Sequence, residues 1–378
     1  MVTRNRPLFW GVPCAALAVL GSSLTAGCKP DLVGRASLIQ EDTLLAVSAS
    51  PAESEENADV TYTSLYVGPK GPVDAASFDW AFCDERKPLA VTGSIAPLCL
   101  VPRGKVLTPI GVGGTVTGHI AADTPCKTFG PFAIDPVAGQ PTPRPADPDT
   151  TGGFYQPLRV RIPLATGDSY TVVTTRLDCG LTNATQEQSI AYAKSYLPNE
   201  NPKLDALTLT RSGAHGEMVP PDETTPSLTL KPGEHVDFDA SWADCAAKTA
   251  CTPCDAQSGA DGGTNADAGA HDGGACSSTC AAGAPAGCTG SESYPYLDPV
   301  SHELVPRREA IRVSWYATDG DFDHDRTGRT EQEAEAKLHT TDNDWTAPNI
   351  AGVVHVWVVI RDDRGGVAWS SYLLNVAP

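Results

Sequence analysis

The chain has 378 residues, enough for two domains, and a formal net charge of −19. A surface this acidic repels phosphate backbones and anionic headgroups, which argues against a nucleic-acid partner and against a basic membrane-binding patch. Hydrophobic residues make up 41% of the chain and charged residues only 19%, with 35 glycines and 32 prolines. This composition favours a turn-rich β protein over a helical one.

The N-terminus has the pattern of an export signal. Arg4 and Arg6 are followed by an apolar stretch over residues 8–20, which is too short to span a membrane. The segment ends at Cys28 in the order Leu, Thr, Ala, Gly, Cys. We therefore expect residues 1–27 to be removed as a signal peptide.

The residues before Cys28 resemble the lipobox of bacterial lipoproteins, in which the cysteine receives a diacylglycerol. Thr25 departs from that pattern, because leucine is usual three residues before the cysteine. The resemblance implies lipidation of Cys28, a tether over residues 28–37, and, since Lys29 follows, a location at the outer membrane or cell surface. The alternative is an ordinary secretory signal that leaves Cys28 as a plain thiol.

Cysteine usage agrees with export. Apart from Cys14 and Cys28, the cysteines number ten, an even count, and we expect them to form about five disulfides. Four lie before residue 180 and six after residue 244, which predicts pairing within each group. The candidates are Cys83, Cys99, Cys126, Cys179, Cys245, Cys251, Cys254, Cys276, Cys280 and Cys288.

Two other roles for the later cysteines stay open. Cys251 and Cys254 have the spacing of a redox motif, and together with Cys276 and Cys280 they could hold zinc. Both roles rank below disulfides, because the motif borders a low-complexity run in an exported chain.

Alternating apolar residues predict a first β-sandwich over residues 38–181. The alternation is clear over residues 45–50, 78–83 and 158–162, and proline-rich and glycine-rich loops such as 139–153 separate the strands.

A short helix is expected in a linker over residues 182–203. Thr185 and Gln188 form a capping box, Ile190, Ala193 and Leu197 share one face, and Pro198 ends the helix. We expect this face to pack at the junction between modules. The run 199–202 (Asn-Glu-Asn-Pro) is typical of a turn.

A second sandwich is expected over residues 204–378. Val236, Phe238, Ala240 and Trp242 alternate with polar residues, as in a half-buried strand. Residues 353–360 are apolar on both faces, which favours a central strand, and a turn at 363–366 leads to a last strand.

An insertion over residues 246–292 interrupts this module. Residues 259–274 contain no large apolar side chain, so we expect a solvated loop whose flanking cysteines hold its base. A faint repeat, in which Trp80 and Trp242 each precede a cysteine by three residues, suggests two modules of one type.

Residues 311–376 resemble immunoglobulin-like modules of the PKD and cadherin-like kind in bacterial surface proteins. The resemblance rests on Trp315 at a strand end, on the run from Gly352 to Gly366, and on its Asp-Asp-Arg-Gly-Gly turn. The lipobox and the Gly/Ala/Asp-rich run are also similar to lipoproteins of large-genome myxobacteria. We expect an all-β chain with two immunoglobulin-like sandwich modules, one short connecting helix and a Gly/Ala/Asp-rich insertion.

One acidic loop is a candidate calcium site, formed by Asp319, Asp321, Asp323 and Asp325. It does not complete an EF-hand, because the sixth and twelfth positions lack glycine and glutamate in either register. Asp342 and Asp344 would have to join it, and a solvated acidic loop is the alternative.

Four tryptophans in the last part of the chain raise the possibility of a sugar-binding platform. Trp315, Trp345 and Trp357 lie among apolar residues and are better explained as core, so Trp369 is the candidate for ligand binding.

No nucleophile, zinc-protease or phosphate-loop motif is found, so we expect no catalysis and no cofactor other than calcium. The leading hypothesis is a lipid-anchored envelope protein with a binding, adhesion or structural role. The alternatives are a carbohydrate-binding accessory module and a calcium-dependent adhesion module. Expected partners are the membrane, through the anchor, and an envelope protein or glycan.

Overall fold

The computed structural model describes residues 35–88, 95–130, 150–222, 224–245, 288–336 and 338–378. Strands dominate these residues, and those from residue 36 onward form a single compact unit. No helix in the described part of the chain is long and apolar enough to cross a membrane. The predicted signal peptide, the tether up to residue 34 and Cys28 lie outside the described residues.

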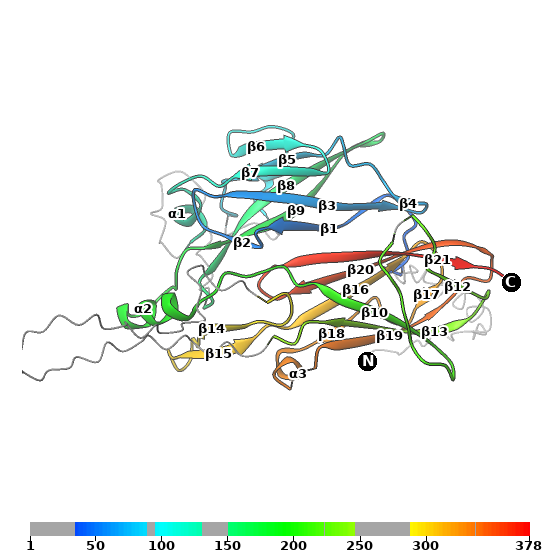
Figure 1. The fold of residues 1–378 in the computed structure, drawn as a ribbon. Helices are drawn as coiled ribbons and strands as arrows, with labels where there is room; N and C mark the ends of the chain where they lie inside the picture. Colours follow the sequence, from blue (N-terminus) through cyan, green and yellow to red (C-terminus); the bar gives the residue numbers. More distant parts are fainter. Residues whose placement is uncertain (1–34, 89–94, 131–149, 223, 246–287, 337) are drawn as a thin grey trace, which may run out of the picture. The chain divides into compact units, whose positions relative to one another are not determined.

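Two sheets form the first sandwich (Figure 1). The first sheet contains β1 (Thr43–Ser50), β3 (Asp59–Gly68), β4 (Gly71–Pro72) and β7 (Thr115–His119). The second runs in the order β2 (Glu53–Ser54), β9 (Gly167–Asp178), β8 (Gly153–Leu164), β5 (Asp79–Cys83) and β6 (Leu107–Val112). Two short helical segments, η1 (Pro97–Cys99) and α1 (Pro125–Phe129), lie in its loops.

The second sandwich also has two sheets. One runs in the order β12 (Leu228–Leu230), β21 (Val367–Val376), β20 (Gly352–Asp362), β16 (Ile311–Ala317) and β18 (Arg326–Arg329). The other runs β11 (Glu217–Met218), β10 (Leu204–Arg211), β13 (His235–Trp242), β19 (Thr340–Thr346) and β17 (Asp321–Phe322). A separate hairpin, β14 (Ser293–Leu297) with β15 (Leu304–Arg308), and the helices α2 (Gln186–Ser195) and α3 (Glu331–Glu335) complete the described elements.

Both sandwiches have the same strand topology. In each, a short strand pairs in parallel with the last strand, β2 with β9 and β12 with β21. The strands β1, β3 and β7 of one sheet correspond to β10, β13 and β19. In the other sheet, the order β2, β9, β8, β5 and β6 corresponds to β12, β21, β20, β16 and β18. The predicted fold class, two immunoglobulin-like sandwiches, is therefore confirmed.

The two modules are of one type, but the tryptophan–cysteine repeat that suggested this does not mark equivalent strands. Trp80 lies on β5, whose counterpart is β16, whereas Trp242 lies on β13, whose counterpart is β3. Trp315 on β16 is thus the topological equivalent of Trp80. A tryptophan followed by a cysteine three residues later is compatible with the end of any strand, so the motif does not identify which strand of the sandwich it lies on.

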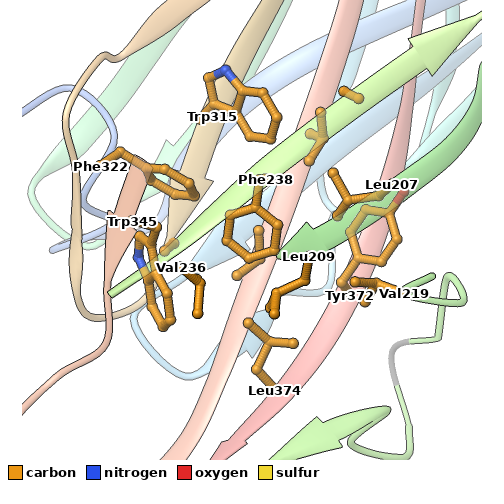
Figure 2. Close-up of a cluster of buried hydrophobic side chains, with 14 of the residues drawn as sticks. Leu207, Leu209, Val219, Val236, Phe238, Trp315, Phe322, Trp345, Tyr372 and Leu374 are labelled. Atoms are coloured by element: carbon orange, nitrogen blue, oxygen red, sulfur yellow. The ribbon is translucent and has the colours of Figure 1, made fainter. Parts of the chain in front are cut away.

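The core of the second sandwich is built from the strands that the alternation predicted. Figure 2 shows Phe238 beside Trp315 and Trp345, with ring centroids 6.2 and 6.0 Å apart. Both tryptophans are completely buried. Leu209 and Leu374 extend this cluster from opposite sheets, so the alternating apolar face of each strand closes on the other sheet (Figure 2).

The core of the first sandwich is smaller and includes one buried hydroxyl. Tyr62 packs against Trp80 and Phe82, and its hydroxyl lies 2.6 Å from the Thr175 hydroxyl. Burial raises the pKa of Tyr62 well above its ordinary value, so the phenol stays protonated and keeps this hydrogen bond.

The strand β20 is buried on both faces for a reason that the sequence did not reveal. Val356 and Val358 face the core of their own sandwich, whereas Trp357 and Val359 face the first sandwich. There they meet Ala46, Leu65 and Val67 from β1 and β3. The second apolar face of β20 is therefore an inter-module core.

The three described disulfides pair within the two expected groups. They join Cys83 to Cys99, Cys126 to Cys179 and Cys245 to Cys288. Each is expected to stabilise the chain by about 2–4 kcal/mol, mainly by restricting the unfolded chain. Cys251, Cys254, Cys276 and Cys280 lie outside the described residues, so the zinc and redox hypotheses stay untested.

Helix α2 begins as predicted but buries a different face. Thr185 caps the helix reciprocally with Gln188, which confirms the capping box. Ile190, however, is 48% exposed, and Tyr192 is the buried residue. The expected apolar face is wrong because two tyrosines, Tyr192 and Tyr196, stack at 4.5 Å and pack inward.

We predict that Trp357→Ala lowers the free energy of unfolding by about 3–5 kcal/mol, because it opens a cavity in the inter-module core. Trp369→Ala, at the half-buried edge of the same cluster, is the matched control and costs less. Denaturant unfolding, together with calorimetry, measures both. A loss below about 1 kcal/mol in Trp357→Ala would show that the two sandwiches do not depend on this contact.

Candidate functional site

The turn between β20 and β21 directs an arginine into the protein. The Oδ1 atom of Asp362 accepts hydrogen bonds from the backbone N–H groups of Arg364 (2.9 Å) and Gly366 (2.8 Å). Gly365 has φ of 102°, which favours glycine, and a Cβ at Gly366 would lie 2.0 Å from the Asp362 carboxylate. The Asp-Asp-Arg-Gly-Gly sequence thus folds so that Arg364 points inward instead of into solvent.

The Arg364 guanidinium is surrounded by carboxylates. Its Nε donates to Glu309 Oε1 at 2.5 Å and its Nη2 donates to Glu292 Oε2 at 2.6 Å. The side chains of Arg364 and Glu292 are each 2% exposed, and that of Glu309 is 0% exposed. The ring of Tyr294 lies 4.9 Å from the guanidinium carbon, which adds a cation–π contact.

A second buried ion pair lies in the first sandwich. The parallel pairing of β2 with β9 puts Glu53 beside Arg176, with Arg176 Nε 3.2 Å from Glu53 Oε1. Arg176 also donates from Nη1 to the Tyr155 hydroxyl (2.9 Å) and from Nη2 to the Tyr196 hydroxyl (3.1 Å). Both charged side chains are almost fully buried.

The linker after α2 joins these two ion pairs. The Tyr196 hydroxyl donates to Glu53 at 2.6 Å and accepts from Arg364 Nη1 at 3.4 Å. Asn199 donates from its backbone to Glu53 (2.7 Å) and from its side chain to Asp362 (3.2 Å). We call the connected set the junction network, which comprises Glu53, Arg176, Tyr196, Asn199, Glu292, Glu309, Asp362 and Arg364.

The predicted turn at residues 199–202 is wrong, because this segment takes part in the contacts between the two sandwiches. No hydrogen-bonded turn forms there, because the asparagine side chains bond to the two sandwiches and not to their own backbone. Asn201 donates to the Ala49 carbonyl of β1 (2.6 Å) and accepts from the Val367 backbone N–H of β21 (2.8 Å). One side chain thus bridges both modules.

The junction network has more acids than bases. Four buried carboxyl groups (Glu53, Glu292, Glu309 and Asp362) face two buried guanidiniums. Burial raises the pKa of Asp362 to about 6, although the Gly366 N–H and Arg364 oppose this, and it raises the pKa of Glu309 well above its usual value. Burial alone would lower the pKa of Arg364, but the surrounding acids, Glu309 foremost, raise it by more. The net shift is upward, so the guanidinium stays charged.

This arrangement is built to hold modules together. Two cavities of about 310 and 290 Å³ lie near the junction, and none of the charged groups of the junction network lines either one. A substrate in those cavities would therefore not touch the buried carboxyl groups.

The predicted calcium ligands do not converge. Asp319 Oδ1 accepts from the Gly320 N–H, Asp325 Oδ1 accepts from the Ser37 N–H, and Asp321 starts β17. Asp323 contributes a backbone N–H to the Asp344 carbonyl. Within the described residues, no group of three or more His, Cys, Asp or Glu side chains is arranged to hold a metal ion.

Asp342 and Asp344 lie on the outer face of β19, the strand with which β17 pairs. They stand directly opposite Asp239 and Asp237 of β13. Partial burial and the facing carboxylates together raise the pKa of Asp237 and of Asp239. The carboxylates of these two strands thus face one another across the sheet.

The tryptophans do not form an exposed row. Trp315, Trp345 and Trp357 have 0% exposure, and Trp369 is half-buried against the inter-module core. The distinction drawn from the sequence between three core tryptophans and Trp369 matches their burial.

Sequence reasoning missed the junction network. Arg364 and Asn199 were named only as parts of predicted turns, and Glu292 and Glu309 were not singled out. The one available signal was the composition of the turn. Asp362 and the glycines at 365 and 366 allow the chain to bend around a side chain that points inward.

We predict that Arg364→Met destabilises the protein by about 3–5 kcal/mol, because it leaves Glu292 and Glu309 buried without a cation. Arg312→Met, at an exposed arginine on β16, is the matched control and should stay within about 0.5 kcal/mol of the parent. Adding Glu292→Gln and Glu309→Gln to Arg364→Met should recover part of the loss. Urea unfolding measures each variant, and equal stability of the two methionine variants would contradict the prediction.

We also predict that stability falls as pH rises from about 4 to 6. Asp362 has a pKa of about 6 in the folded chain and about 4 when unfolded, so the folded state binds more protons in this window. Asp362→Asn keeps the Oδ1 acceptor and should make the decline shallower. The urea midpoint at several pH values measures this, with Asp205→Asn on β10 as the control, and an unchanged slope in Asp362→Asn would refute it.

Comparison with known proteins adds little to this description. No family model matches the chain, and no curated protein matches it. Among solved structures, it is similar to a Salmonella alpha-2-macroglobulin mutant (8% identity, TM-score 0.21, 89% of this chain and 17% of that chain). It is also similar to fibronectin(III)-like modules of Clostridium thermocellum CbhA (9% identity, TM-score 0.18, 88% of this chain and 94% of that chain).

A third similar structure is dimeric latent PorU from Porphyromonas gingivalis (9% identity, TM-score 0.18, 90% of this chain and 24% of that chain). The chain thus spans less than a quarter of the length of two of these three structures. At such TM-scores the similarities carry no argument about function, and the immunoglobulin-like fold rests on the strand topology of the chain itself.

Proposed function

We propose that this chain is a lipid-anchored cell-envelope protein whose two sandwiches act as one rigid binding, adhesion or structural unit without catalysis. The observation that carries the proposal is the burial of the junction network between the two sandwiches. The largest buried cluster of charged groups among the described residues joins the two modules, and it lines neither cavity near it.

Cysteine chemistry supports the exported location. Three disulfides join the described residues, and such bonds persist in oxidising compartments outside the cytoplasm. The basic and apolar N-terminus and the lipobox-like residues before Cys28 support secretion followed by lipidation. An outer-membrane or cell-surface position is the location that this combination favours.

The junction supports a mechanical or display role. Two modules that share an apolar core and a buried ionic network keep a fixed relative orientation, which suits a spacer or a composite binding surface. The carbohydrate-binding and calcium-dependent alternatives gain no observation of their own, since Trp369 is half-buried and the acidic loop does not converge.

We predict that the full chain, expressed in a Gram-negative host, incorporates radiolabelled palmitate and fractionates with membranes. Cys28→Ala should abolish labelling, because it removes the thiol that carries the diacylglycerol. Cys14→Ala, which changes the other cysteine before residue 29, is the matched control and should label normally. An unlabelled parent chain found in the cytosol with free thiols would overturn the anchor.

The binding role is tested by isothermal titration of the purified full chain against envelope proteins and glycans. The proposal expects saturable binding to at least one of them. It fails if the chain binds none of these partners and instead turns over a substrate.

A further inference from the structure

Arg361 is half-buried and differs from the buried arginines of the described chain. Its Nη2 donates to the Leu45 carbonyl at 2.8 Å and its Nη1 donates to the Ser314 hydroxyl at 3.3 Å. The ion pairs found among the described residues include none to Arg361. By contrast, Arg159, Arg176 and Arg364 each have a carboxylate partner within 3.2 Å.

The surroundings of Arg361 disfavour its charge. Burial lowers the pKa of its guanidinium, and the positive charge of Arg326 adds to this, whereas Tyr316 opposes it. A cation that is partly withdrawn from water without an anion beside it costs free energy even when neutral groups accept its hydrogen bonds. In a chain with a net charge of −19, an anion for this position would have been easy to supply from a neighbouring side chain.

The guanidinium has hydrogen-bonding capacity to spare. It carries five N–H donors, and its described partners are the Leu45 carbonyl, the Ser314 hydroxyl and Tyr316. With one N–H directed to each of these partners, two donors remain, enough for the two oxygens of a carboxylate.

A cavity of about 310 Å³ lies beside this group. It opens between β1 and β9 of the first sandwich, and the turn between β20 and β21 completes it. The gap exists because β2 pairs with β9 only at Arg176 and Leu177, so it does not cover the earlier part of β9. The volume is at the small end of the range for ligand sites, which is about 300–1,000 Å³.

Most of the residues that line the cavity are apolar. Leu44, Val47, Tyr62, Val173 and Val367 are among them, and Thr171 and Thr174 are polar lining residues. A ligand that matches this lining has one anionic end and an apolar body of a few carbons. An inorganic anion would meet Arg361 but would leave these walls uncovered.

We propose that this cavity binds a small apolar monocarboxylate, whose carboxylate meets Arg361 and whose hydrocarbon part packs on Val47, Tyr62 and Val173. The ligand would contact both sandwiches, because Arg361 belongs to the second and the apolar walls belong mainly to the first. This site is independent of the lipid anchor and of the envelope role proposed above.

The test is isothermal titration of the full chain with hexanoate, hexanol, hexylamine and inorganic phosphate. Hexanoate should bind saturably, and each of the other three should bind at least about tenfold more weakly, which corresponds to the loss of about 1.4 kcal/mol. The proposal is overturned if hexanoate does not bind, or if hexanol or phosphate binds as tightly.

Two variants locate the site. Arg361→Met should weaken hexanoate binding at least tenfold and leave hexanol unchanged, whereas Arg312→Met, the exposed control on β16, should bind like the parent. Val173→Phe keeps Arg361 but fills the cavity, and it should also weaken hexanoate binding, so a folding defect in Arg361→Met would not leave the proposal untested. Parent-like binding in Val173→Phe, or in a folded Arg361→Met variant, would overturn it.

Discussion

The fold depends on the burial of Arg364 among the carboxyl groups of the junction network. A guanidinium loses its hydration when it is buried, and only nearby anions and hydrogen-bond acceptors can compensate. Glu292 and Glu309 each accept one of its N–H bonds, and the Tyr196 hydroxyl and the Leu197 carbonyl accept two more. These acceptors come from the hairpin region, the linker and the second sandwich, so the arginine is satisfied only when all three parts are in place.

The apolar and polar parts of the junction are complementary. The inter-module core around Trp357 stabilises the contact between the two sandwiches through apolar burial, which is non-directional. The hydrogen bonds of Asn199 and Asn201 fix the relative orientation of the sandwiches. Buried polar groups of this kind tolerate few alternative arrangements, because any shift leaves a donor or an acceptor unpaired. The junction thus combines an apolar contact that stabilises the association of the modules with hydrogen bonds that permit only one geometry.

Features controlled by local pattern were predictable from the sequence. The alternation from Val236 to Trp242, the apolar run of β20 and the capping box at Thr185 each depend on neighbours within one element, and all three form. The junction network was not predictable, because Glu292, Glu309 and Arg364 become neighbours only through the folded topology. The two faces of β20 were recognised as apolar, but the sequence could not say that a second module covers one of them. In the same way, the acidic loop at Asp319 suggested a metal site by spacing alone, whereas in the fold Asp319 and Asp325 accept hydrogen bonds from backbone N–H groups.

The disulfides have a consequence for the integrity of the chain. Cys83–Cys99, Cys126–Cys179 and Cys245–Cys288 each enclose a stretch of sequence, with separations of 16, 53 and 43 residues. A protease that cuts inside any of these stretches leaves both fragments covalently joined, and the core strands on either side keep their packing. A nicked protein would therefore migrate as one species until a reductant separates its pieces, which gives the chain a tolerance of proteolysis that its sheets alone would not provide.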